Sequence, residues 1–121
     1  MYFDIDRFKH INDTYGHDVG DEVIRTFASR VRGVVRDEDV VARLGGDEFI
    51  MIVENLADEH AADVIADKLV QSMAEPFEVG DVLIEVSTSI GVAYYRPGMT
   101  PDELVKAGDD AMYAAKRAGR N

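Results

Sequence analysis

Acidic residues follow an apolar segment at the very start of the chain. Met1-Tyr2-Phe3 is typical of the end of a strand, and Asp4 and Asp6 come directly after it, separated by Ile5. Carboxylates are costly to bury unless they are paired or bind a metal ion. For Asp6 we favour a structural role as the N-cap of the next helix. Asp4 is equally consistent with a solvated strand end and with a metal ligand.

A glycine pair followed by two acids, Gly45-Gly46-Asp47-Glu48, lies between two apolar runs. The glycines permit positive φ and let a ligand approach the backbone closely. Because successive strand residues face opposite ways, only one of the two acids need point at any one site. Taken alone, the segment is typical of an ordinary hairpin tip with a solvated rim.

A polar segment from residue 12 to residue 21 contains an amide and a carboxylate that suit guanine. Asn12 can pair with the guanine carbonyl, and Asp21 can pair with its N–H groups. The same segment is equally typical of a polar turn that caps the following helix. His17, as a lone histidine, more often has a structural than a catalytic role.

Basic residues close the chain, with Lys116 and Arg120 among them. They are expected at a helix C-terminus from the helix dipole alone, and they could equally bind phosphate. A further pair, Arg36 and Asp39, has the (i, i+3) spacing of an exposed ion pair, which is worth about 0.2–0.5 kcal/mol.

Hydrophobic periodicity predicts the elements that position these residues. Helices are expected over residues 8–15, 18–35, 58–73 and 101–117. Strands are expected to end near residue 3 and to run over residues 40–44, 48–53, 78–79 and 82–92, the last one half-buried because its apolar residues alternate. The order β-α-α-β-β-α-β-β-α predicts an α/β fold with helices packed around a central, mostly antiparallel sheet.

Composition limits the possible functions. The 121 residues carry 13 basic and 24 acidic side chains, for a net charge of −11, and no cysteine. One domain fits this length, and disulfides and thiolate metal sites are excluded. The longest apolar run, Phe49 to Val53, is too short to cross a membrane, and we see no signal peptide. The acidity argues against binding a nucleic-acid polymer but suits a nucleotide held through divalent metal.

Four ordered blocks of the sequence together resemble the GGDEF family, the diguanylate cyclases. Residues 3–21 resemble its opening block, residues 45–49 (Gly-Gly-Asp-Glu-Phe) match its naming motif, residues 89–93 resemble its late strand, and residues 110–121 resemble its closing helix. The resemblance implies a fold similar to the nucleotidyl cyclase and polymerase palm. It also implies a single domain over residues 1–121 in which the family's first helix and the start of its first strand are missing.

The resemblance implies that two GTP molecules condense to cyclic di-GMP and two pyrophosphates between two domains that face each other as a homodimer. Two divalent ions per active site, Mg²⁺ or Mn²⁺, would be held by Asp4, Asp47 and the Ile5 carbonyl. Asp47 would also help to deprotonate the attacking hydroxyl, and Glu48 would support the metal site.

The resemblance also assigns the nucleotide contacts. Asn12 and Asp21 would recognise guanine, and His17 would lie near the sugar. Gly45 and Gly46 would let the nucleotide pass close to the hairpin. The β and γ phosphates would be held by Lys116 and Arg120, with help from Lys9.

Arg36 and Asp39 fit the family's R-x-x-D inhibitory site for the product, at the expected distance before Gly45. An alternative is a non-catalytic GGDEF module that binds GTP or cyclic di-GMP and regulates a neighbouring domain. A third possibility is a nucleotidyl cyclase that acts on one GTP, or a relative of the palm polymerases; the guanine-binding pair and the hairpin motif count against it. The family resemblance further implies a cytoplasmic domain without membrane contact of its own, whether or not the parent protein is anchored in a membrane.

Overall fold

The computed structural model describes residues 1–118, which form four helices and six strands. The helices are α1 (Phe8–Tyr15), α2 (His17–Val34), α3 (Glu59–Ser72) and α4 (Pro101–Arg117). The strands are β1 (Tyr2–Ile5), β2 (Val40–Gly45), β3 (Glu48–Ile52), β4 (Phe77–Val79), β5 (Val82–Ile84) and β6 (Thr88–Gly91). No helix in this described part is long and apolar enough to span a bilayer.

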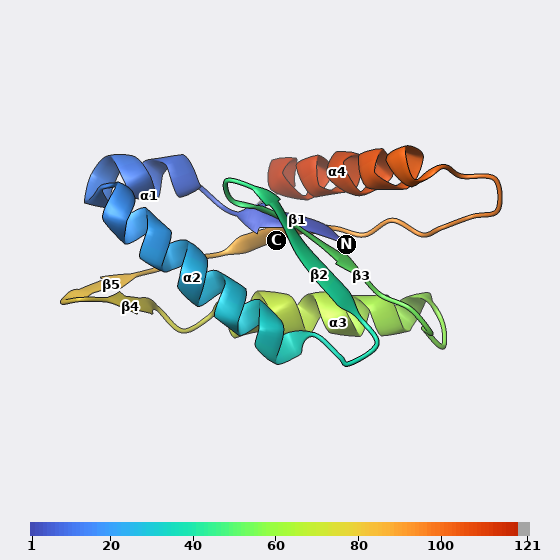
Figure 1. Cartoon of the computed structure of the whole chain (residues 1–121), viewed down its shortest axis with the longest axis horizontal. Coiled ribbons are helices and arrows are strands. Elements are labelled where there is room, and N and C mark those ends of the chain that lie inside the picture. Colours follow the sequence, from blue (N-terminus) through green and yellow to red (C-terminus); the bar gives the residue numbers. More distant parts are fainter. Residues whose placement is uncertain (119–121) are drawn as a thin grey trace.

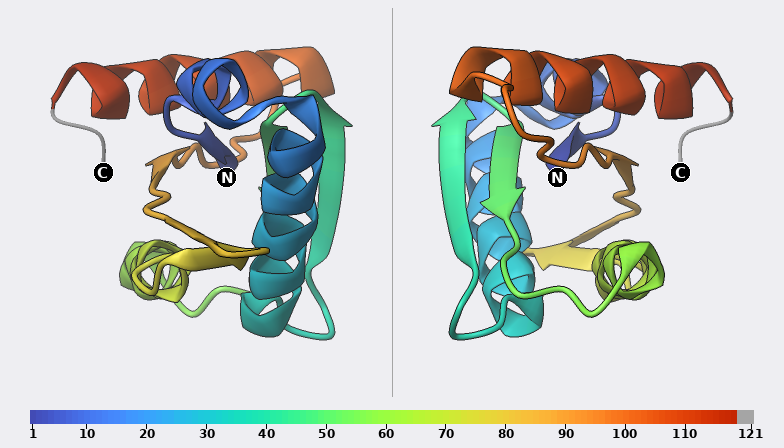
Figure 2. Two further views of the ribbon diagram at one scale, coloured as in Figure 1. Left: turned by 90° about the vertical axis from the view of Figure 1, so that its left-hand side faces the viewer. Right: turned by 90° about the vertical axis from the view of Figure 1, so that its right-hand side faces the viewer.

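The central sheet has the strand order β2-β3-β1-β6, and every neighbouring pair is antiparallel. Strands β4 and β5 form a separate antiparallel ribbon. Helix α4 covers one face of the sheet, whereas α2 and α3 pack on the other (Figures 1 and 2). This arrangement confirms the predicted fold class.

The core lies between the sheet and helices α2 and α3. Alternate residues of β1 point to opposite faces of the sheet, and Phe3 and Ile5 are fully buried on this side. Phe3 stacks on Phe49 of β3 with ring centroids 5.8 Å apart, and Phe27 of α2 lies 5.1 Å from Phe49. These contacts fix the central strand against the longest helix, so the residues on the other side of β1 have a rigid support.

Helix α4 lies unusually close to the sheet at two glycines. A Cβ atom added to Gly91 of β6 would overlap the Gly108 carbonyl and the Met112 nitrogen, and one added to Gly108 would lie 3.2 Å from the Tyr2 Cβ. The start of α4 is fixed by a capping box in which the Thr100 and Glu103 side chains each accept from the other's backbone N–H. The two glycines therefore set the height of α4 above β1.

The predicted single strand over residues 82–92 is wrong, because the segment is divided between two sheets. Its alternation persists, with Ile84, Val86 and Thr88 buried. Strand β5 pairs with β4, however, whereas β6 pairs with β1. Alternation reports which residues face the core and says nothing of which strand supplies the hydrogen bonds, so it cannot reveal a change of partner.

Candidate active site

Asp4 lies at the end of β1, on the face that α4 covers. It pairs in register with Glu48 of β3 and with Ser89 of β6, and the residue is only 5% exposed. Its Oδ2 accepts from the Lys116 ammonium of α4, while its Oδ1 is buried without a hydrogen-bond partner among residues 1–118. A buried carboxylate with one oxygen unsatisfied in this way is a candidate ligand for a cation.

Burial raises the pKa of Asp4 to about 6. The ion pair with Lys116 opposes this effect, and the neighbouring carboxylates Asp47 and Asp6 add to it. The raised pKa shows that the surrounding side chains do not fully compensate the charge of Asp4.

The tip of the β2–β3 hairpin brings Asp47 to the same place. Gly45 and Gly46 have φ angles of 145° and 53°, which side chains other than glycine rarely adopt. The Asp47 carbonyl accepts from the Ile5 N–H at 3.2 Å, which ties the tip to the end of β1. Burial raises the pKa of the Asp47 carboxyl. Figure 1 shows this tip at the same end of the sheet as the last turn of α4 and the start of α1.

Glu48 is held by a residue that sequence reasoning missed. The Tyr2 hydroxyl donates to Glu48 Oε2 at 2.7 Å, and burial together with this contact raises the pKa of Tyr2. Tyr2 and Asp4 are two residues apart on β1 and therefore share a face of the sheet. That spacing was the available signal, because any side chain at position 2 must lie beside the site.

Arg43 is a second residue that the sequence analysis did not single out. It lies on β2 just before the glycine pair, and its Nε donates to the Gly46 carbonyl at 2.8 Å. Its positive charge lowers the pKa of Asp47, although the effect of burial is larger. A cation two residues before a glycine pair with acids was the signal in the sequence.

The residues at this site fit a divalent cation. Asp4 and Asp47 are two oxygen donors beside the Ile5 backbone, and Asp4 has an orphaned buried oxygen. Hard cations such as Mg²⁺ are commonly bound through one or two carboxylates, with substrate phosphates and water as the other ligands. Within residues 1–118 no group of three or more His, Cys, Asp or Glu side chains forms a cation cage, so a cation here would need further ligands.

Asp6 does not cap helix α1, which corrects our prediction. The N-cap position belongs to Arg7, with a φ of 55° and no side-chain cap. The Asp6 carboxylate instead accepts from Ser87 Oγ and Ser89 Oγ, each at 2.7 Å. Both oxygens of Asp6 are thus occupied by hydroxyl groups of the segment that ends in β6. This carboxylate fastens two distant parts of the chain.

The residues expected to bind guanine and sugar lie on α1 and α2. Asn12 is half-buried in the middle of α1, and no atom of the described part of the chain donates a hydrogen bond to its buried Oδ1. Asp21 and His17 are exposed on the first turns of α2, and Lys9 is exposed on α1. The two helices pack against each other, and Asn12 lies at their contact, beside Gly20 of α2. Lys9 lies in the first turn of α1.

Of the two residues near the end of the chain that were predicted to bind phosphate, the structure describes Lys116. Lys116 lies beside the carboxylates, where it pairs with Asp4. Arg120 lies outside the described residues.

Arg36 and Asp39 form a tight ion pair at the other end of the hairpin. Arg36 donates from Nε and Nη2 to the two carboxylate oxygens of Asp39 at 3.0 and 2.8 Å, and it also contacts the Glu54 carbonyl. The Asp39 side chain is fully buried, and Arg36 lowers its pKa. The pair precedes β2, and Glu54 follows β3, so it lies away from the glycine tip.

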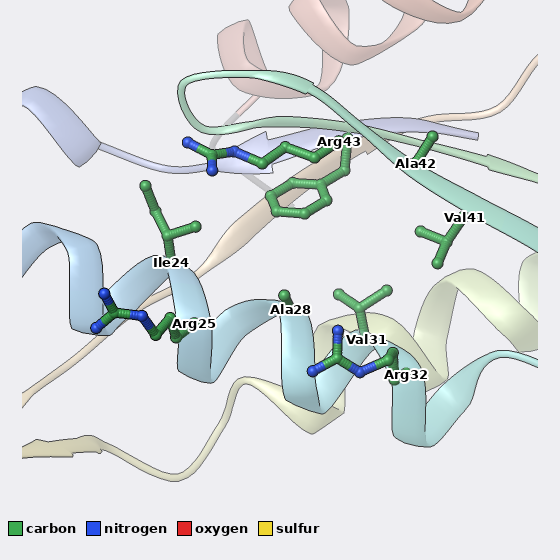
Figure 3. A pocket seen from close by; sticks show the side chains of 9 residues that line it. Ile24, Arg25, Ala28, Val31, Arg32, Val41, Ala42 and Arg43 are labelled. Atoms are coloured by element: carbon green, nitrogen blue, oxygen red, sulfur yellow. The ribbon is translucent and has the colours of Figure 1, made fainter.

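A groove runs between α2 and β2, on the core side of the sheet. Its volume is about 560 Å³, and its apolar floor includes Val31 and Phe49. Figure 3 shows Arg25 and Arg32 of α2 and Arg43 of β2 around it. This groove contains none of the carboxylates described above.

Comparisons with known proteins agree with these observations. The model of the family described as "Diguanylate cyclase, GGDEF domain" matches residues 1–121. MucR of Pseudomonas aeruginosa, a bifunctional diguanylate cyclase/cyclic di-GMP phosphodiesterase, is 43% identical over 122 residues, covering 100% of this chain and 18% of MucR. The chain therefore spans about a fifth of the length of that curated relative.

Two solved structures share the fold. The GGDEF domain of TpbB (YfiN) from Pseudomonas aeruginosa has a TM-score of 0.94 and 45% identity, covering 98% of this chain and 75% of that one. The GGDEF domain of DgcB from Caulobacter crescentus, in complex with c-di-GMP, has a TM-score of 0.91 and 33% identity, covering 99% of this chain and 72% of that one. The identity and the TM-scores together agree with the match to the family model.

Proposed function

The chain belongs to the GGDEF domain family of diguanylate cyclases, and from this premise we propose that it condenses two GTP molecules into cyclic di-GMP and two pyrophosphates. The observation that carries the proposal is the meeting of two carboxylates, the buried Asp4 and the half-buried Asp47, beside Lys116. In each condensation the 3′-hydroxyl oxygen of one GTP attacks the α-phosphorus of the other. The bond to the β-phosphate breaks, and pyrophosphate leaves.

Two divalent ions, Mg²⁺ or Mn²⁺, would be held by Asp4, Asp47 and the Ile5 carbonyl together with the phosphates. Bound there, they would neutralise phosphate charge and lower the pKa of the attacking hydroxyl. The unsatisfied Oδ1 of Asp4 supports this assignment, because a buried carboxylate oxygen without a donor is costly unless a ligand completes it.

Asp47 accepts the proton of the attacking hydroxyl. Its raised pKa supports this role, because a carboxylate with a higher pKa is a stronger base. Glu48 is kept beside the site by the Tyr2 hydroxyl and supports the metal position.

Lys116 exchanges partners when substrate arrives. Without ligand it neutralises Asp4. With a divalent cation held at Asp4, the Lys116 ammonium would be free to bind the β and γ phosphates together with Arg120, and Lys9 would assist from α1.

Asn12 and Asp21 select guanine. The Asn12 amide oxygen is turned inward, so the Nδ2 branch of this half-buried side chain is the one available to the guanine carbonyl. Asp21, exposed on α2, accepts from the N1 and N2 groups. Adenine offers an amino group in place of the carbonyl and lacks the N2 donor, so it leaves both protein groups poorly paired. His17 lies near the sugar.

Each domain contributes one GTP, so turnover requires a homodimer. Gly45 and Gly46 present a tip without side chains, which allows a nucleotide to pass between the two hairpins. Specific activity should therefore rise with protein concentration, and a fused dimeric coiled coil should raise it further. A dilute monomer with concentration-independent specific activity would contradict this mechanism.

Arg36 and Asp39 would form a product-inhibition site for cyclic di-GMP. A guanidinium suits both phosphate and the guanine edge. Because both Asp39 oxygens accept from Arg36 in the structure, Asp39 would accept from guanine N–H groups only once Arg36 turned from it to the product. Because the pair lies away from the glycine tip, inhibition would come from fixing two domains in an unproductive arrangement, and it would be non-competitive with GTP.

Incubation of the chain with GTP and Mg²⁺, followed by chromatographic separation of the nucleotides, tests the proposal. We expect cyclic di-GMP and pyrophosphate from the wild type and neither from Asp47→Ala. Binding of GTP without any product would instead identify a non-catalytic GGDEF module. Formation of a cyclic mononucleotide would identify a cyclase that acts on one GTP.

A further inference from the structure

Gly20 in the first turns of α2 has a steric role that Gly33, further along the same helix, does not share. A Cβ atom added there would overlap the Asn12 amide oxygen and lie 3.0 Å from the Asn12 Cγ. The ring of Phe8 would lie 3.4 Å away, an ordinary contact. The backbone of Gly20 is helical, with its N–H donating to the Gly16 carbonyl at 3.1 Å, so φ does not require a glycine here. The space does.

Gly33 provides an internal comparison on the same helix. A Cβ atom added to Gly33 would meet nothing within 4 Å, and the residue is exposed. A glycine inside a helix is unfavourable relative to alanine because it loses more backbone freedom on folding. The glycine at position 20 is therefore unfavourable for the helix but makes room for the Asn12 side chain, whereas position 33 has no such contact.

The side chain that uses this room is polar and unsatisfied. The Asn12 Oδ1 lies in the space above Gly20, buried and, within residues 1–118, without a hydrogen-bond donor. An unpaired buried oxygen gains nothing there in the absence of a ligand. What the position achieves is orientation, because the amide oxygen lies against the bare backbone of α2 at Gly20, in a space that the Phe8 ring also borders.

We propose that Gly20 is a positioning residue for guanine recognition. By leaving room for the Asn12 amide oxygen, it fixes the rotamer in which the amide nitrogen points to the base. The inference rests on the proposed function, since it deepens the role of Asn12. A methyl group at position 20 would move the end of a flexible side chain, not the backbone, so the fold would survive while the amide turned away.

The experiment measures binding of 3′-deoxy-GTP and 3′-deoxy-ATP to the full chain by calorimetry. These nucleotides lack the attacking hydroxyl and cannot condense. We expect Gly20→Ala to weaken 3′-deoxy-GTP binding at least tenfold and 3′-deoxy-ATP binding much less. Gly33→Ala is the matched control and should leave both affinities unchanged. The melting temperature of Gly20→Ala should stay close to that of the wild type.

A double-mutant cycle with Asn12→Ala separates positioning from a general disturbance of α2. In the Asn12→Ala background, Gly20→Ala should have no further effect on 3′-deoxy-GTP binding, and it should raise the melting temperature as an ordinary glycine-to-alanine change in a helix. If Gly20→Ala alone did not fold, the double variant would still be expected to fold, because the clashing atom is gone.

The outcomes are distinguishable. No binding of 3′-deoxy-GTP by the wild type would overturn the proposed function itself. Guanine-selective binding by the wild type with equal affinity in Gly20→Ala would overturn only the role of Gly20. An equal loss from Gly20→Ala with and without Asn12 would show that the glycine does not act through the amide, and would overturn it as well.

Discussion

Asp4 and Asp6 lie two residues apart at the end of β1, and each is 5% exposed, yet their surroundings differ. Both oxygens of Asp6 accept from serine hydroxyls at 2.7 Å. Asp4 has one oxygen paired with Lys116 and one to which no group in the described residues donates. Equal burial therefore conceals opposite roles: a saturated carboxylate holds the fold together, whereas an unsatisfied one is available to a ligand.

The largest expected effect that tests this comparison between Asp4 and Asp6 is on the rate of cyclic di-GMP synthesis. Asp47→Ala should lower the rate of cyclic di-GMP synthesis by about 10³-fold or more, because one carboxylate both binds metal and accepts the proton. Asp4→Asn should act similarly, since an amide is a poorer ligand for a hard cation. Asp6→Asn is the matched control and should stay within about tenfold of the wild type. Initial rates at saturating GTP and Mg²⁺ measure this, and a wild-type rate in Asp47→Ala would sink the site assignment.

The second test uses the pH dependence of stability without divalent metal. The pKa of Asp4 is about 6 in the folded chain and about 4 in an unfolded one, so the folded state binds this proton more tightly. Its contribution to stability is therefore full below pH 4 and is lost as the pH rises through 6. Asp4→Asn removes that loss.

Relative to the wild type, we expect the free energy of unfolding of Asp4→Asn to rise between pH 4 and pH 7, by up to about 3 kcal/mol. Urea titrations with a chelator present at several pH values measure the difference. A constant difference across this range would show that the surroundings of Asp4 fully compensate its charge.

The third test concerns Asp6, whose two carboxylate oxygens both accept hydrogen bonds. Asp6→Ala should lower the free energy of unfolding by about 1–3 kcal/mol, because it leaves the buried Ser89 hydroxyl without its acceptor. Asp6→Asn should lose less, since an amide can still exchange hydrogen bonds with hydroxyl groups. Chemical denaturation of the three proteins at pH 7 is the measurement. If Asp6→Ala were as stable as the wild type, the serine contacts would have no structural weight.

The smallest expected effect is at Asp39. Like those of Asp6, both of its carboxylate oxygens accept hydrogen bonds. Arg36→Ala should lower the free energy of unfolding by about 1 kcal/mol, because Asp39 keeps its bond from the backbone N–H of residue 36. The initial rate should stay within about twofold of the wild type, and the slowing that accompanies product accumulation should be relieved. Titration of cyclic di-GMP into both proteins decides the matter: equal affinity would leave only an ion pair.

Local signals predicted the parts of the fold that depend on local chemistry. Helix 101–117 has the predicted bounds because Thr100, Pro101 and Glu103 define its start in the sequence itself. The positive φ angles at Gly45 and Gly46 follow from residue type in the same way. Asp4 and the hairpin with Asp47 could likewise be picked out in the sequence, but only the family pattern placed them in one site.

The errors arose where the decisive partner is distant in sequence. Asp6 looked like a helix cap because its serine partners are more than 80 residues away. Tyr2 was passed over because Glu48 is 46 residues away. The division of residues 82–92 between two sheets likewise depends on which strands lie alongside. Such choices are made by packing between elements, which periodicity within one segment does not record.

The close approach of Gly91 and Gly108 is a backbone contact about which helix α4 can tilt. Lys116 lies eight residues beyond Gly108, about 12 Å along the helix axis. A tilt of about 5° about this contact would displace the Lys116 ammonium by about 1 Å, roughly the difference between a good and a broken hydrogen bond. A single methyl group at Gly91, on the sheet, would thus displace Lys116 from its position in the active site.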